Sequence, residues 1–100
     1  MSLTKQQVAA TISEFASAMG QLGVSDEEAA SALGTTPGYI RDVANLRARH
    51  IEDPWILRNY LIERADEQGS PRPSFSALVG DYHGYWFLNS RRIERGKLDR

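Results

Sequence analysis

A short stretch between positions 36 and 49 carries the polar side chains that proteins use to bind nucleic acid. Arg41 and Asn45 lie four residues apart and would both face outward from a helix. In the major groove of DNA, arginine pairs well with guanine and asparagine with adenine. Thr36, Arg47 and Arg49 could hold phosphate groups beside them. These residue types predict contact with double-stranded DNA.

Acidic residues close to this stretch argue against strong DNA binding. Asp42 lies between Arg41 and Asn45 and would repel phosphate. Asp26, Glu27 and Glu28 would direct further negative charge toward the DNA backbone. Neutralisation of phosphates by lysine and arginine supplies most non-specific affinity for DNA. The alternative is therefore a protein–protein interaction module that keeps the same fold without binding DNA.

Other reactive constellations are weak. Asp81 and His83 could form an acid–histidine pair, but no nucleophile or third ligand accompanies them. His50 has no neighbour at metal-ligand spacing, and the chain contains no cysteine. We expect no enzyme, no catalytic residue, no metal site and no cofactor.

The elements that position the polar stretch are two short helices between Ser25 and Leu46. Ser25 and Glu28 have the spacing of a capping box at a helix start. Gly34 can end that helix in a sharp turn, and Thr36 followed by Pro37 suits the start of a second helix. The pattern predicts a helix–turn–helix arrangement, although a plain helical hairpin would show the same signals.

Longer helices are predicted on either side of this pair. Thr4 is suited to cap a helix that ends at Gly20. Asp53 is suited to cap a second helix, with Pro54 in its first turn and Gly69 at its end. A wide apolar arc on this second helix places it at the centre of the core.

The chain after Gly69 is less regular. Residues 70–74 contain two prolines and are predicted to form a loop. Apolar spacing favours a helix from about Ser74 to Tyr82 and a last short helix starting near Ser90, with Ile93 inward and Gly96 at its end.

An aromatic run lies between these last two segments. Aromatic residues are enriched in the cores of protein interfaces. We expect the run to pack the end of the domain or to form a dimer contact through Tyr82, Tyr85, Trp86 and Phe87.

Length and composition indicate an ordinary soluble domain. The 100 residues fit one domain, with 41% hydrophobic and 25% charged residues. The net charge of −1 is unusual for a dedicated DNA-binding domain, although residues 91–100 are basic. No apolar run approaches a membrane span and no signal peptide is recognisable, so we expect a cytoplasmic protein with no membrane contact.

Two resemblances add to these expectations. The stretch "SDEEAASALGTTPGYIRDVANL" resembles the helix-turn-helix of the Cro/repressor-like regulators, which implies that the second helix lies in the major groove. The whole chain also resembles a small family of uncharacterised bacterial proteins. That likeness rests on the segments "MSLTKQQ", "LGTTP", "HIEDPWILRNYLIE", "ALVGDYHGYWFL" and "IERGKL". It implies a soluble bacterial protein and assigns no functional residue.

The sequence thus predicts an all-α chain of about five helices in a single domain spanning residues 1–100. Residues 4–69 would form a Cro/repressor-like core, and residues 74–100 would form a C-terminal extension. The leading hypothesis is a DNA-binding transcription regulator that acts as a homodimer, because one short recognition helix rarely provides enough specificity alone. The alternative is the protein-interaction module.

Overall fold

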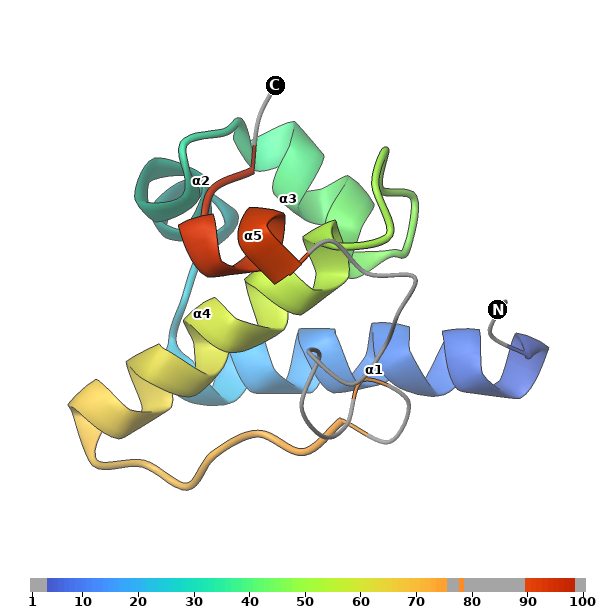
Figure 1. The fold of residues 1–100 in the computed structure, drawn as a ribbon. Coiled ribbons are helices and arrows are strands. Elements are labelled where there is room, and N and C mark those ends of the chain that lie inside the picture. The colour runs from blue at the N-terminus through green and yellow to red at the C-terminus, as the bar shows by residue number, and fades with distance from the viewer. Residues whose placement is uncertain (1–3, 76–77, 79–89, 99–100) are drawn as a thin grey trace.

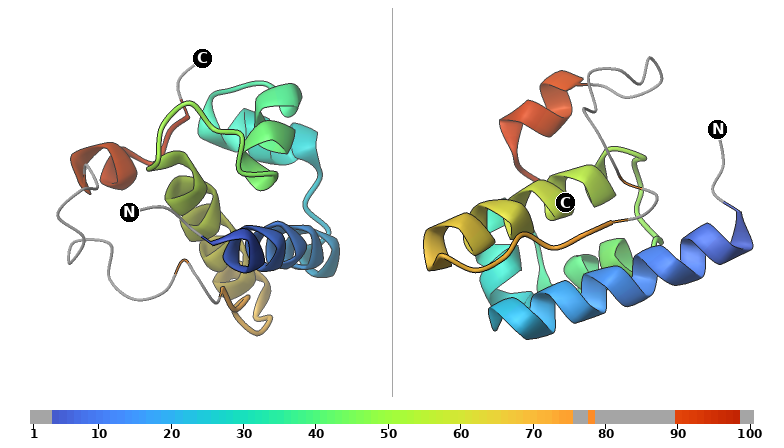
Figure 2. Two further views of the ribbon diagram at one scale, coloured as in Figure 1. Left: turned by 90° about the vertical axis from the view of Figure 1, so that its right-hand side faces the viewer. Right: turned by 90° about the horizontal axis from the view of Figure 1, so that it is seen from below.

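The computed structural model describes residues 4–75, 78 and 90–98. This part of the chain contains five helices and no strand: α1 (Lys5–Leu22), α2 (Asp26–Leu33), α3 (Pro37–Ala44), α4 (Asp53–Gln68) and α5 (Ser90–Arg95). The predicted all-α class with five helices is confirmed. Figure 1 shows α1 along the base with α4 crossing it, and the view from below in Figure 2 shows α5 on one side of α4 and α1 on the other. Helix α3 packs against both α1 and α4.

Helix α1 begins at the predicted cap but ends later than predicted. The Thr4 hydroxyl accepts a hydrogen bond from the Gln7 backbone N–H at 3.1 Å, and the Gln7 side chain accepts from the Thr4 N–H at 2.9 Å. Gly20 lies inside the helix, which continues to Leu22. The chain leaves the helix at Gly23, which has a φ of 66°. Glycine adopts this left-handed conformation without a steric cost, so Gly23 and not Gly20 ends the helix.

Helices α2 and α3 begin and turn where the sequence predicts. Ser25 and Glu28 form a reciprocal capping box at the start of α2. Gly34 has a φ of 73° and reverses the chain after α2. The Thr36 hydroxyl then accepts a hydrogen bond from the Tyr39 backbone N–H at 3.2 Å, and Pro37 is the first residue of α3.

Helix α4 is central, because both α1 and α3 pack against it (Figure 2). Leu57, Leu61 and Ala65 on this helix have no exposed surface. Burial of a leucine side chain contributes about 1.5–3 kcal/mol, so this row is a main source of stability. Helix α4 ends at Gly69, as predicted, with a φ of 69°.

One hydrophobic cluster joins the helices to the chain beyond α4. Phe75 packs on Phe15 of α1 with ring centroids 5.0 Å apart. Ile93 of α5 and Leu98 are also buried in this cluster. The inward position of Ile93 and the end of α5 at Gly96, which has a φ of 68°, agree with the sequence-based prediction.

The helix predicted from about Ser74 to Tyr82 is not present where the chain is described. Ser74, Phe75 and Leu78 are not helical, and the remainder of the predicted helix lies outside the described residues. Pro71 and Pro73 disfavour helical backbone at Ser70 and Arg72, so the chain leaves α4 as a non-helical segment. At the end of this segment Phe75 packs on Phe15 of α1.

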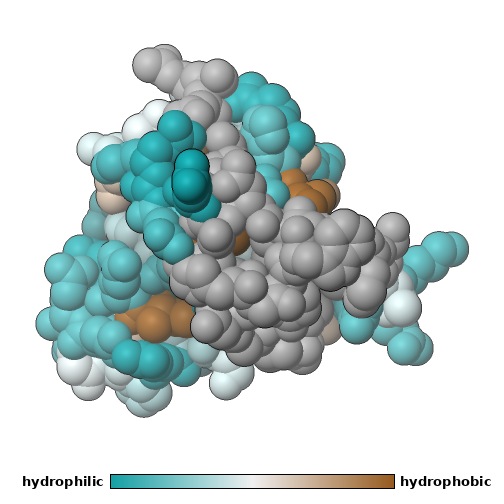
Figure 3. Space-filling model, in the orientation of Figure 1, coloured by the Kyte–Doolittle hydropathy of each residue, from teal (hydrophilic) through white to brown (hydrophobic). Residues whose placement is uncertain are grey.

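The face drawn in Figure 3 is mostly hydrophilic where the chain is described, and its hydrophobic side chains form small patches. Of the helices described, none combines the length and the apolar character that crossing a membrane would require.

Candidate nucleic-acid interface

Helix α3 presents one side to solvent because its other side is anchored in the core. Tyr39, Ile40 and Val43 are buried, with Ile40 and Val43 fully inaccessible. Gly38 and Arg41 are exposed on the outer side. The buried positions follow helical spacing, which therefore determines the residues available to a partner.

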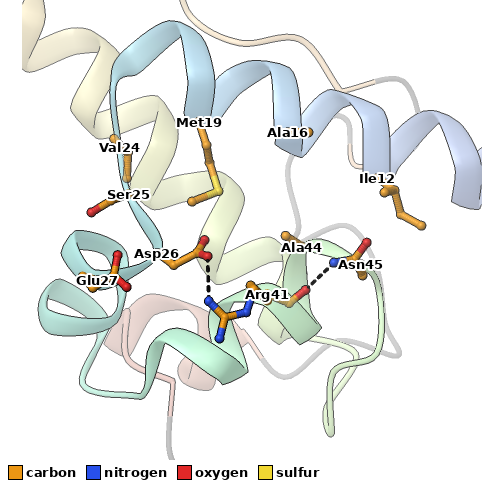
Figure 4. Close-up of a pocket in the computed structure, with 10 residues that line it drawn as sticks. All are labelled: Ile12, Ala16, Met19, Val24, Ser25, Asp26, Glu27, Arg41, Ala44 and Asn45. Atoms are coloured by element: carbon orange, nitrogen blue, oxygen red, sulfur yellow. Dashed lines mark hydrogen bonds and ion pairs between the residues drawn. The ribbon is translucent and has the colours of Figure 1, made fainter.

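Arg41 and Asp26 connect the outer sides of α3 and α2. The Arg41 Nη1 atom lies 3.1 Å from Asp26 Oδ2, and Figure 4 shows the two side chains facing each other. The side chains are 59% and 29% exposed, respectively. An ion pair with this exposure contributes about 0–1 kcal/mol, so it can be exchanged for another partner at little cost.

Asn45 serves as the C-terminal cap of α3. Its backbone N–H and its side-chain Nδ2 both donate to the Arg41 carbonyl, at 3.0 and 2.8 Å. Contact with adenine would use the same amide group. The structure thus places Asn45 beside Arg41, as its spacing implies. The Asn45 amide group is already hydrogen-bonded to the backbone of α3.

The two arginines after α3 also have partners within the chain. Arg47 Nη2 lies 3.3 Å from Asp42 Oδ1, and the two side chains are 67% and 46% exposed. The Arg49 guanidinium lies over the Tyr39 ring, 4.2 Å from its centroid. Thr36, the remaining candidate, is exposed and caps α3. The structure therefore brings all five candidates to α3 and the residues beside it.

The acidic residues that argue against DNA binding lie next to these arginines. Asp26 pairs with Arg41, and Asp42 pairs with Arg47. Glu28 points elsewhere, because its carboxylate lies 3.6 Å from Arg64 on α4. The charge on this face is thus close to balanced, and Asp26 also neutralises part of the positive end of the α2 dipole.

Tyr39 is the residue of this region that the sequence analysis missed. Its hydroxyl donates to the Asp53 carboxylate on α4 and accepts from the Arg49 backbone N–H at 2.8 Å. Burial raises the pKa of Tyr39 above its ordinary value of 10.0, and the bond to Asp53 raises it further. The sequence signal that could have identified Tyr39 is its position next to Ile40, which predicts a side chain at the edge of the buried face of α3.

Asp53 was predicted to cap α4, and that prediction is wrong. Glu52 occupies the cap position without a side-chain hydrogen bond, and Asp53 is the first helical residue. Asp53 is fully buried and accepts from Tyr39. A buried carboxylate needs a hydrogen-bond donor, and here the donor comes from another helix.

A pocket of about 470 Å³ lies beside Arg41, between α1 and the α2–α3 pair (Figure 4). Ile12, Met19 and Ala44 supply apolar surface to it, and Asp26 and Arg41 supply charge. The surface next to α3 is therefore a shallow depression that combines apolar and charged side chains.

Several predicted features fall outside the described residues. These are the aromatic dimer contact at Tyr82, Tyr85, Trp86 and Phe87 and the Asp81–His83 pair. Within residues 4–75, 78 and 90–98, no three histidine, aspartate or glutamate side chains are grouped closely enough to hold a metal ion.

A comparison with known protein families assigns the chain to a family. The sequence profile of the family described as "Uncharacterized protein conserved in bacteria (DUF2316)" matches residues 1–89. The chain belongs to the DUF2316 family. Neither a curated protein nor a solved structure matches it. The predicted membership of an uncharacterised bacterial family is confirmed, and DUF2316 membership assigns no role to any residue.

The DUF2316 match includes α1 to α4 and ends before α5. All five candidate DNA contacts, together with Tyr39 and Asp53, therefore lie inside the family region. The buried residues Ile93 and Leu98, which complete the core, lie beyond it.

Proposed function

We propose that α2, the turn at Gly34 and α3 form a helix-turn-helix of the Cro/repressor type, and that this DUF2316 member binds double-stranded DNA as a transcription regulator. The order of four helices, the caps at Ser25 and Thr36, and the left-handed Gly34 support this proposal. Such a role would place the protein in the cytoplasm, and it includes no catalytic step.

The observation that carries the proposal is the exposure of Arg41 on the outer side of an anchored α3. Its side chain is 59% exposed and its ion pair with Asp26 is weak. A guanidinium in this position can leave Asp26 and pair with guanine or phosphate. Arg47 is 67% exposed and can exchange Asp42 for phosphate in the same way.

The proposal includes a homodimer. One helix of eight residues contacts few base pairs, so specific recognition needs two half-sites. In a two-fold dimer the two copies of α3 would lie about 34 Å apart, which is one turn of duplex. The aromatic run from Tyr82 to Phe87 remains the proposed dimer contact.

Binding of the full chain to mixed-sequence duplex DNA tests this function. Fluorescence anisotropy at low and moderate salt would measure affinity for the natural chain, Arg41→Ala and Arg47→Ala. We expect salt-sensitive binding that is roughly tenfold weaker in each variant, since each loses a charged contact.

Arg72→Ala is the matched control, because Arg72 is an equally exposed arginine. It pairs with Asp66 near the other end of α4, away from α3. Its removal should leave DNA affinity unchanged. If the natural chain shows no binding even at low salt, where phosphate attraction is strongest, the proposed function is wrong.

The second candidate function is a protein-interaction module, and the paired charges favour it. Asp26 and Asp42 already engage the two arginines that DNA binding requires. Asp26→Asn and Asp42→Asn separate the two functions. If α3 binds DNA, each change should strengthen binding, because a repulsive carboxylate is removed. If the module binds only protein, neither variant should acquire salt-sensitive DNA binding.

A further inference from the structure

In the segment between α3 and α4 the acidic side chains are buried and the basic side chains are exposed. Its sequence from Arg47 to Asp53 contains two arginines and two acidic residues, so it is balanced in composition. In the structure, Glu52 is only 8% exposed and Asp53 is fully buried. Arg47, Arg49 and His50 are exposed instead. The exposed side of residues 47–51, called here the basic loop, therefore presents the guanidinium groups of Arg47, which is paired with Asp42, and of Arg49.

An exposed apolar side chain belongs to the same loop. Ile51 is 58% exposed, and it is the large hydrophobic side chain that stands out as exposed in the described part of the chain. Single exposed apolar residues are common on proteins. Ile51 differs because it directly follows the exposed Arg49 and His50, on the loop that comes after α3.

The backbone of the basic loop is held in place, so the exposure of Ile51 belongs to an ordered conformation. The Arg47 N–H donates to the Asp42 carbonyl at 2.7 Å, and the Arg49 N–H donates to the Tyr39 hydroxyl at 2.8 Å. The Asp53 N–H donates to the His50 carbonyl at 3.1 Å. Leu46, which precedes the loop, adopts a φ of 57°, a conformation that costs a non-glycine residue energy.

A surface of this kind has a specific chemical partner. Cationic side chains fit the phosphates of a polyanion, whereas an exposed branched aliphatic side chain gains nothing from phosphate. Proteins that bind the minor groove combine both features, because they place basic residues along the groove and insert an apolar wedge between base steps.

We propose that the basic loop is a second DNA-contacting element, in which Ile51 enters the minor groove next to the site occupied by α3. The inference rests on the proposed function and extends it from one helix to two elements. The side chains of Arg47, Arg49 and His50 lie along the groove. Tyr39 and Asp53, which are buried beneath the loop, hold its backbone in position.

Affinity for an A·T-rich duplex tests the role of Ile51 directly. Anisotropy would compare the natural chain with Ile51→Ser and Ile51→Leu. We expect Ile51→Ser to weaken binding on the order of tenfold, because the apolar contact is lost, and Ile51→Leu to retain it. Netropsin, which occupies the minor groove, should compete with the natural chain and have less effect on the residual binding of Ile51→Ser.

Thermal unfolding provides the control for folding. Because Ile51 is largely exposed, Ile51→Ser should unfold at the same temperature as the natural chain. Equal DNA affinity of Ile51→Ser and the natural chain would overturn the inference, and so would binding that netropsin does not affect.

The failure of this inference can be distinguished from the failure of the proposed function. DNA binding that depends on Arg41 but not on Ile51 overturns only the role of the basic loop. No DNA binding by the natural chain overturns both. Sedimentation of the free protein tests whether Ile51 instead contacts a second copy of the chain. If Ile51→Ser dissociates a dimer but leaves DNA affinity unchanged, Ile51 serves self-association and the inference is overturned.

Discussion

Tyr39 shows how one residue connects the candidate DNA-binding helix to the rest of the molecule. Its hydroxyl bonds to Asp53, 14 positions later, and to the backbone of Arg49. Its ring also supports the Arg49 guanidinium. Through these contacts Tyr39 holds α3, the basic loop and α4 together, although its own side chain is buried.

Replacing Tyr39 with phenylalanine should therefore destabilise the fold while leaving the exposed residues unchanged. Asp53 would lose a hydrogen-bond donor in a fully buried position, which costs about 1–3 kcal/mol. Urea unfolding would measure the loss. Tyr60→Phe is the matched control, since Tyr60 is a partly buried tyrosine of α4 that packs against the core. Equal stability of the two variants would contradict a structural role for the Tyr39–Asp53 bond.

The contribution of Tyr39 should also depend on pH. Burial and the bond to Asp53 raise the pKa of Tyr39, so the folded state holds this proton more tightly than the unfolded state. The resulting stability is full below the ordinary pKa of 10.0 and is lost as the pH rises through the folded-state pKa. The stability difference between the natural chain and Tyr39→Phe should shrink in that alkaline range.

At the scale of elements, Lys97 and Leu98 bind the backbone carbonyl groups at the C-terminal end of helix α2. The Leu98 backbone N–H donates to the Leu33 carbonyl, and Lys97 Nζ donates to the Ala32 carbonyl, both at 2.7 Å. Helix α2 has no basic residue in its own last turn. Lys97 therefore supplies the positive charge that favours a helix C-terminus, and it does so beside the turn that leads into α3.

Leu98→Ala should cost about 2–5 kcal/mol, because the leucine is fully buried and its removal leaves a cavity. Lys97→Met, which keeps the side-chain stem, should cost at most about 1 kcal/mol. Urea unfolding measures both effects, and hydrogen exchange should show faster opening at the end of α2. If Leu98→Ala unfolds like the natural chain, the segment does not support α2.

Some elements follow from local sequence and others do not. The caps at Thr4, Ser25 and Thr36 and the left-handed Gly34 and Gly69 depend on neighbouring residues alone, so their positions could be predicted. The contact of Phe75 with Phe15 could not be predicted, because the two residues are far apart in the sequence and meet only when the chain packs.

At the scale of the molecule, the core does not end with α4. Phe75, Leu78, Ile93 and Leu98 are all buried in the same cluster as Phe15 and Leu61. A fragment of residues 1–69 would expose the surfaces that these side chains cover. We expect it to unfold at much lower urea than the full chain, since lost burial of each large apolar side chain costs about 1.5–3 kcal/mol.

Circular dichroism during urea unfolding would measure that difference. The full chain unfolded in parallel is the reference for the midpoint. A fragment as stable as the full chain would show that residues 70–100 contribute nothing to the stability of the core.

The candidate site was partly predictable for the same reason as the helices. Arg41, Asn45, Arg47 and Arg49 could be identified from residue type and spacing, and so could the opposing Asp26 and Asp42. Their pairing could not, because Asp26 lies 15 positions before Arg41 and meets it only when α2 and α3 pack.

The sequence by itself determined the all-α class, the helix caps at Thr4, Ser25 and Thr36, and the membership of a bacterial family, because these depend on local spacing or on matching residues. Only the tertiary structure decided which charges reach solvent. It buries Glu52 and Asp53, exposes Arg49 and Ile51, and places Arg41 against Asp26. The physical reason is that burial and pairing depend on residues from other helices, which a linear pattern cannot bring together.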